Sequence, residues 1–334
     1  MHVELDGARA PATCRRTNRL AVAIARVERG SPSALPIERR DREPITLNND
    51  TATETVKMSV DQSELSEVAP VADRGLPDIR LYVIRCGELM IYPKSPQECS
   101  IPVQWYVLTH PLGNIVIDGG NAPEVARDPR KRWGPIVDVV WPTMKAEDAC
   151  ALQLRDLGIA PESVKWILQT HLHHDHTGAM ADIGSFPNAS VLARREEYDY
   201  ARSPDWFYRP SYIEEDFNSP DIPWTFLGDD EDGFDLYGDG VVRVWKTYGH
   251  TPGHQSFEIT LPQSGRTFLV TGDAVSDKDV WEKKSLPPMT VSNREAAASV
   301  EKLHNIARKT GATVIFSHDP VQWLEHSPLP AYYA

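Results

Sequence analysis

Histidines and an aspartate crowd into six consecutive residues of this 334-residue chain, and they offer the chemistry of a metal site. Residues 171–176 read His-Leu-His-His-Asp-His, directly after an apolar run at 164–170 that predicts a buried strand. A strand that ends in such a cluster directs its side chains to one place in the following loop. Imidazole nitrogen and carboxylate oxygen are ligands that suit zinc, so the motif predicts a zinc site at a strand end.

Further candidate ligands follow three later segments that read as strands. The strands and the residues after them are 241–246 with His250, 267–270 with Asp273, and 313–316 with His318. Every candidate ligand therefore lies just past a strand end. That placement lets a sheet give rigidity to an irregular site.

The remaining pattern predicts a mixed chain of strands and helices. Further strands are expected at 78–83, 103–108 and 114–118. A helix is expected at 145–157, with Gly158 as its stop. Ser292 and Glu295 form a capping box that opens a second helix, whose apolar side is made of Ala296, Val300, Leu303 and Ala307.

The order of these motifs resembles that of the metallo-β-lactamase fold superfamily of hydrolases. His-x-His-x-Asp-His, a later Gly-His, a Gly-Asp and a last His occur in this order within residues 79–331. Inside the superfamily the chain is most similar to the N-acyl-homoserine lactonases, on the segments 249–256, 270–274 and 317–323. The resemblance implies an α+β fold, the αββα sandwich of the metallo-β-lactamase type.

The resemblance also implies two zinc ions per chain and a ligand set for them. His171, His173 and His250 would bind one ion, Asp175, His176 and His318 the other, and Asp273 would bridge the two. The residues agree with this set, because His171 and His173 alternate along an extended segment and can point to the same side. Two metal ions about 3.5–4 Å apart can share a hydroxide and polarise a carbonyl together.

The reaction implied is the opening of a lactone ring, most readily that of N-acyl-homoserine lactones, which degrades a quorum signal. The metal-bridging hydroxide would attack the carbonyl, and Asp175 would relay the proton to the leaving alkoxide. The chain has no Gly-x-Ser-x-Gly elbow for a serine nucleophile. Two alternatives stay open: a related metallo-hydrolase acting on another lactone, an aryl ester or an organophosphate, and a non-catalytic metal-bound regulatory or interaction protein.

One position departs from the lactonase pattern. Homoserine lactonases commonly carry a tyrosine three residues after the bridging aspartate, where this chain has Ser276. Serine keeps a hydroxyl but reaches less far. Either Tyr208 or Tyr248 supplies the missing hydroxyl as a catalytic residue, or the substrate is not an acyl-homoserine lactone.

Three other polar residues near the motifs have a supporting role or none. His174 is expected to point away from the metals, and His254 to support the site without binding an ion. Asp118, before Gly119 and Gly120, either orients a ligand histidine or simply ends a strand in a turn.

Composition limits the partners. The net charge of −13 argues against nucleic acid, whose phosphates require clustered Lys and Arg. No run of about 18 apolar residues exists, so we expect no membrane span and a cytoplasmic protein. The aromatic-rich segment 203–237 is expected to lid an apolar substrate pocket, to form a homodimer face, or simply to pack onto the sandwich.

Residues 1–75 are predicted to be a disordered extension before a hydrolase domain at 76–334, because they show no sustained helical or strand period. The apolar run Leu20–Ala25 is too short for a signal peptide, and Met58 is a plausible alternative start.

We therefore predict that a chain beginning at Met58 folds and keeps its activity. Residues 1–57 carry a net charge of +2, opposite in sign to the rest, and have no apolar face to pack. Circular dichroism and a hydrolysis assay on the truncated chain test this. A truncated chain that does not fold would show that the extension packs on the domain.

Overall fold

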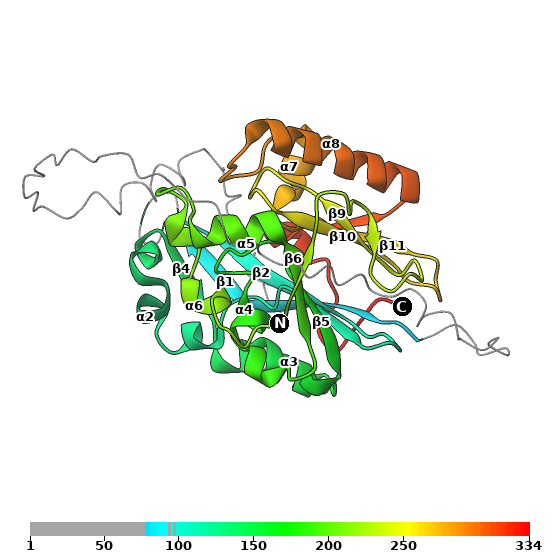
Figure 1. Ribbon diagram of the computed structural model, residues 1–334, viewed down its shortest axis with the longest axis horizontal. Coiled ribbons are helices and arrows are strands. Elements are labelled where there is room, and N and C mark those ends of the chain that lie inside the picture. Colours follow the sequence, from blue (N-terminus) through cyan, green and yellow to red (C-terminus); the bar gives the residue numbers. More distant parts are fainter. Residues whose placement is uncertain (1–77, 93–94, 96–97) are drawn as a thin grey trace, which may run out of the picture. The chain divides into compact units, whose positions relative to one another are not determined.

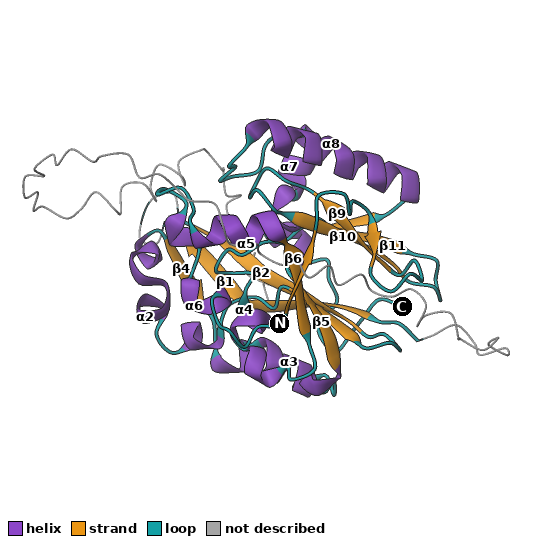
Figure 2. Cartoon of the chain, viewed as in Figure 1, coloured by secondary structure: helices purple, strands orange, loops and turns teal. Residues whose placement is uncertain are grey.

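The computed structural model describes residues 78–92, 95 and 98–334, and the predicted extension at 1–75 lies outside these residues. Two β-sheets lie in separate layers, with helices on their outer sides (Figures 1 and 2). The larger sheet has seven strands in the order β4-β1-β2-β3-β5-β6-β7. The smaller has five strands in the order β12-β11-β10-β9-β8.

The bounds of the elements are as follows. The strands of the larger sheet are β1 (Leu81–Ile91), β2 (Cys99–Leu108), β3 (Asn114–Ile117), β4 (Val140–Thr143), β5 (Val164–Leu168), β6 (Ser190–Arg194) and β7 (Trp224–Leu227). The strands of the smaller sheet are β8 (Phe234–Asp235), β9 (Val242–Lys246), β10 (Gln255–Thr260), β11 (Thr267–Val270) and β12 (Thr313–Ile315). The helices are α2 (Pro129–Trp133), α3 (Cys150–Asp156), α4 (Gly178–Ala181), α5 (Arg195–Arg202), α6 (Glu214–Phe217), α7 (Lys278–Lys283), α8 (Asn293–Thr310) and α9 (Pro320–Trp323).

Alternation along the strands divides the buried apolar side chains into three layers. In β2, Trp105 faces the layer under α2, α3 and α4, while Tyr106 faces the layer between the sheets. In β11, Phe268 faces the layer between the sheets, while Leu269 packs with Leu303 of α8. Helix, sheet, sheet and helix therefore follow one another, and the predicted αββα sandwich is confirmed.

Strand direction explains where the site lies. β3, β5 and β6 are parallel neighbours, so the segments after them start from the same edge of the larger sheet. β11 and β12 are parallel, and β9 runs in their direction because both it and β11 pair antiparallel with β10. The predicted ligands follow β5, β9, β11 and β12, so each sheet delivers its ligands from one edge.

Two predicted elements are shorter in the structure than in the prediction. The strand predicted at 164–170 ends at Leu168, because the Thr170 N–H donates to Asp118 Oδ1 and not to a neighbouring strand. The helix predicted at 145–157 starts only at Cys150, since Ala149 has an extended backbone with ψ of 137°. Its stop is confirmed: Gly158 has φ of +73°, and the Ile159 N–H donates to the Leu154 carbonyl.

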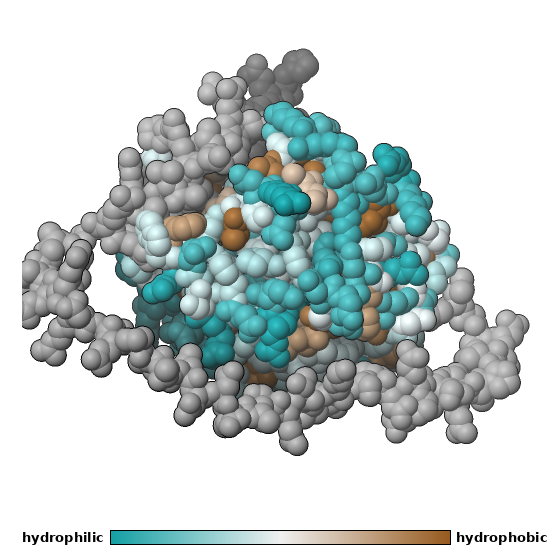
Figure 3. All heavy atoms as spheres, turned by 45° about the horizontal axis from the view of Figure 1, so that its top comes forward, coloured by the Kyte–Doolittle hydropathy of each residue, from teal (hydrophilic) through white to brown (hydrophobic). Residues whose placement is uncertain are grey.

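The aromatic segment 203–237 contains α6, β7 and β8. Tyr208, Tyr212 and Phe217 are buried in the layer under the helices, so packing onto the sandwich is confirmed for them. Trp206 is 49% exposed. On the face in Figure 3, apolar side chains form small separate patches among hydrophilic ones. A lid or a homodimer face stays a prediction.

In the described part of the chain, no helix has the length and apolar character to cross a bilayer.

Candidate metal centre

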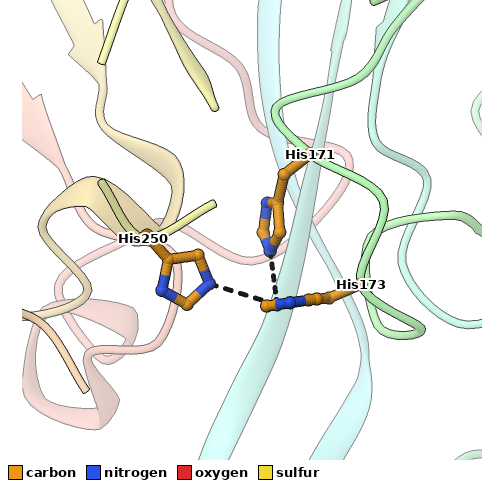
Figure 4. Close-up of side chains that lie close together, drawn as sticks. All are labelled: His171, His173 and His250. Atoms are coloured by element: carbon orange, nitrogen blue, oxygen red, sulfur yellow. Dashed lines mark hydrogen bonds between the residues drawn. The ribbon is translucent and has the colours of Figure 1, made fainter. Parts of the chain in front are cut away.

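The three histidines predicted for one ion form a first cluster (Figure 4). His173 Nδ1 lies 3.0 Å from His171 Nε2 and 3.1 Å from His250 Nε2. A neutral imidazole nitrogen has one lone pair, so His173 Nδ1 cannot accept hydrogen bonds from both neighbours. A cation between the rings would use all three lone pairs. The spacing is near the roughly 3.3 Å that separates nitrogen ligands of a tetrahedral zinc.

Asp175, His176 and His318 form a second cluster. Asp175 Oδ2 lies 3.5 Å from His318 Nε2 and 3.7 Å from His176 Nε2. His176 Nε2 is buried and has no hydrogen-bond partner within the described residues. A buried polar atom in such a position indicates a ligand that completes the site.

Asp273 lies between the two clusters and faces both. Its Oδ2 is 3.6 Å from His250 Nε2 in the first cluster. Its Oδ1 is 3.1 Å from His318 Nε2 and 3.5 Å from His176 Nε2 in the second. The fold thus brings all seven residues predicted as ligands to one place, and Asp273 occupies the position that a bridging ligand needs.

The two clusters differ in charge. Burial lowers the pKa of His171 and of His173 well below the usual value, so their rings are neutral and keep a lone pair. Burial also opposes a charge on His176, yet Asp175, Asp273 and Asp118 raise its pKa to about 10. A cation that binds the second cluster must displace that proton, and its affinity should therefore fall at low pH.

Asp118 orients the second cluster. It follows β3 in a left-handed backbone conformation with φ of +66°. Its carboxylate accepts hydrogen bonds from the Thr170 N–H at 2.7 Å, the Thr170 hydroxyl at 2.9 Å and His176 Nδ1 at 2.8 Å. The bond to Nδ1 leaves His176 Nε2 facing the cluster. Of the two alternatives for Asp118, this hydrogen bond to His176 favours the orienting role.

Two more of the histidines predicted as ligands, His250 and His318, are held in a similar way by backbone carbonyls. His250 Nδ1–H donates to the Pro288 carbonyl at 3.2 Å. His318 Nδ1–H donates to the Pro102 carbonyl at 2.8 Å. In both rings Nε2 is left to face the cluster, and the ring cannot turn without losing a buried hydrogen bond.

The two histidines expected to stand outside the ligand set do so. His254 Nε2 accepts a hydrogen bond from the Asp273 N–H at 3.0 Å, and His254 Nδ1–H donates to the Thr247 hydroxyl at 2.8 Å. His254 therefore holds the backbone of Asp273 and belongs to neither cluster. His174 belongs to neither cluster, and its ring stacks on Trp133 at 4.1 Å.

Comparison with known proteins agrees with this geometry. The family model of the metallo-beta-lactamase superfamily matches residues 101–318. The chain belongs to the metallo-beta-lactamase superfamily. Two relatives named N-acyl homoserine lactonase AttM are similar over their whole length, which covers 77–78% of this chain. The one from Azorhizobium caulinodans is 44% identical over 266 residues. The one from Agrobacterium fabrum is 45% identical over 267 residues.

A solved structure of an N-acyl homoserine lactone hydrolase, with the product N-hexanoyl-L-homoserine bound at its catalytic metal center, is also similar. It is 27% identical to this chain, with a TM-score of 0.66, and the match covers 76% of this chain and 98% of that one. A structure of a mutant of B. thuringiensis AiiA, with N-decanoyl-L-homoserine bound at the active site, has the same identity and TM-score.

In this member of the superfamily, the hydroxyl groups expected near the substrate are engaged elsewhere. The Tyr208 hydroxyl donates to the Thr290 carbonyl at 2.7 Å. The Tyr248 hydroxyl donates to Asp229 at 3.2 Å, and the Ser276 hydroxyl to Asp277, also at 3.2 Å. The structure therefore brings neither tyrosine into the two clusters, and their catalytic role stays a prediction.

Glu197, in the first turn of α5, has no counterpart in the sequence analysis. Its carboxylate is buried and accepts hydrogen bonds from two loops that carry ligands. Burial raises its pKa to about 7. The run Arg195–Asp199 is typical of a solvated helix face, so the sequence carries no signal for this residue.

We predict that Asp118→Asn weakens metal binding about 10- to 100-fold, the range expected when a group that orients a ligand is altered. An amide offers one acceptor oxygen, so either His176 or Thr170 loses its partner. Metal retained against increasing chelator, measured by elemental analysis, tests this. Asp138→Asn, the same change at an exposed carboxylate, is the control. Equal retention by both variants would contradict the orienting role.

Proposed function

We propose that this protein is a dinuclear zinc hydrolase that opens the ring of N-acyl-homoserine lactones. The observation that carries the proposal is Asp273, whose two oxygens face different clusters of metal-ligating groups. A single-ion site would have no use for a carboxylate in that position. The residues that would hold the ions are His171, His173, His250, Asp175, His176, His318 and Asp273.

The substrate class is supported by the relatives. Proteins named N-acyl homoserine lactonase AttM match this chain along their full length at 44–45% identity. A similar solved structure holds an N-acyl homoserine product at its metal center. All seven proposed ligands lie within residues 101–318, the part of the chain that the family model of the superfamily matches.

Bound zinc would supply a polarised lactone carbonyl and a water molecule acidic enough to attack it near neutral pH. We assign proton transfer to Asp175. Burial disfavours its charge, but His176, His174 and His318 hold the pKa of its carboxyl well below the usual range. An ionised Asp175 can take the proton of the attacking water. It can then deliver that proton to the ring oxygen as the acyl–oxygen bond breaks, which gives a free hydroxyl and a carboxylic acid; the acid loses its remaining proton to solvent at neutral pH.

We predict close to two zinc ions per purified chain, and loss of lactone hydrolysis when a chelator removes them. Asp273→Ala should lower both the metal content and the rate, because this side chain serves both clusters. Elemental analysis and acid release during ring opening measure the two effects. Asp279→Ala, an exposed aspartate of α7, is the control. Full activity in metal-free protein would refute the proposal.

The same assay separates the alternatives when it includes an aryl ester and a phosphotriester. Faster turnover of either, with no ring opening, would favour the related metallo-hydrolase. Two bound ions with no turnover of any substrate would favour a metal-bound interaction protein.

A further prediction concerns the hydroxyl group that contacts the substrate. The side chain of Ser276 is shorter than the tyrosine that homoserine lactonases commonly have at this position. If Tyr208 or Tyr248 contacts the substrate during the reaction, its replacement by Phe removes one hydrogen bond worth roughly 1.5–3 kcal/mol. The rate on acyl-homoserine lactones should then fall about ten- to a hundredfold, and Ser276→Tyr should restore part of it. If both Phe variants keep the wild-type rate, neither tyrosine fills this role.

A further inference from the structure

We infer that Glu197 is a positioning residue for the first cluster, and that its buried carboxylate holds the His171–His173 segment and the His250 loop at the spacing one metal ion requires. The inference deepens the proposed function and rests on the metal centre proposed there. The hydrogen bonds of the Glu197 carboxylate and the close packing at Gly253 support this role.

The first oxygen of Glu197 holds the segment after β5. Oε1 accepts a hydrogen bond from the Leu172 N–H at 2.9 Å. Leu172 stands between two ligands of the first cluster, and its side chain is fully buried. A bond to this N–H fixes the backbone from which His171 and His173 project to the same side.

The second oxygen holds the loop after β9. Oε2 accepts hydrogen bonds from the Thr251 hydroxyl at 2.5 Å and from the Gly253 N–H at 3.1 Å. Thr251 directly follows His250. Gly253 directly precedes His254, which accepts the bond from the Asp273 backbone. One side chain thus connects two ligand-bearing segments that lie about eighty residues apart in the chain.

Packing at Gly253 shows that this contact is close. A Cβ on Gly253 would lie 2.2 Å from the Glu197 nitrogen and 2.6 Å from its Cα. No other residue fits without moving the loop or α5. The absence of a side chain at Gly253 therefore lets the loop approach closely enough for its N–H to reach the carboxylate.

Besides these two segments, the Glu197 carboxylate faces Tyr212, whose ring packs edge-on against His173 of the first cluster with ring centroids 4.9 Å apart. The second-cluster histidines are held by other groups. His176 is held by Asp118 and His318 by the Pro102 carbonyl. Loss of Glu197 should therefore weaken one metal ion more than the other. A general loss of stability would affect both ions alike.

Glu197→Gln is the test variant, because it conserves volume but offers one acceptor oxygen. Either the Leu172 or the Gly253 N–H is then left buried and unpaired. At pH 8 we expect one of the two ions to bind about 10- to 100-fold more weakly. Asp199→Asn, the same change at an exposed carboxylate of α5, should leave both affinities unchanged.

Two further variants, each of which lacks a proposed ligand of one cluster, identify which ion Glu197→Gln affects. With His318→Ala, the remaining ion occupies the first cluster, and adding Glu197→Gln should weaken it by the same factor. With His173→Ala, the remaining ion occupies the second cluster, and adding Glu197→Gln should change its affinity little. If Glu197→Gln does not fold, Thr251→Val removes one hydrogen bond without unpairing a backbone N–H. It should show a smaller loss with the same dependence on background.

Equal weakening in both backgrounds, or no weakening in either, would overturn the inference while leaving the proposed metal centre intact. A wild-type chain that binds no metal would instead overturn the proposed function, and this inference with it.

Discussion

The rest of this structure depends on one constraint: carboxylates are buried among imidazoles. Only hydrogen bonds and cations can stabilise such a cluster. An isolated buried carboxylate costs several kcal/mol unless it is paired. Asp175 and Asp273 are paired with His176 and His318, and both histidines have a raised pKa as a result. The first cluster is neutral and offers lone pairs only. Such a site is complete with divalent cations, which fits a metal-dependent superfamily.

The αββα sandwich meets this constraint with strand ends. Each sheet has parallel strands that end at one edge, and the loops that follow these strands carry the proposed ligands. In three of the proposed ligand histidines, the ring nitrogen that faces away from the cluster makes a hydrogen bond. The pairs are His176 with Asp118, His250 with the Pro288 carbonyl and His318 with the Pro102 carbonyl. Loops alone would not hold these rings, because loop backbones move more than strands. Hydrogen bonds to residues on other elements supply the missing rigidity.

Substrate recognition is less tightly coupled to the fold than metal binding is. Ser276 stands where related lactonases commonly have tyrosine, and its carbonyl accepts the His318 N–H at 3.0 Å. Its backbone thus contacts the second cluster, while its buried side chain donates to Asp277 and belongs to neither cluster. Several aromatic residues of the segment 203–237 are part of the core. One fold commonly serves several substrates, because residues around a site can change while the fold persists.

The sequence by itself determined which residues are candidate ligands, the order of the strands that carry them and the stop of α3 at Gly158, because each depends on local pattern. Tertiary structure alone decided three further features. β5 ends at Leu168 because Asp118, about fifty residues earlier, takes the N–H of Thr170. Asp273 faces both clusters because β9, β11 and β12 run in the same direction and end at the same edge of the smaller sheet. Glu197 joins two loops from a helix that reads as solvated. All three arise from contacts between residues far apart in the chain, which local periodicity does not encode.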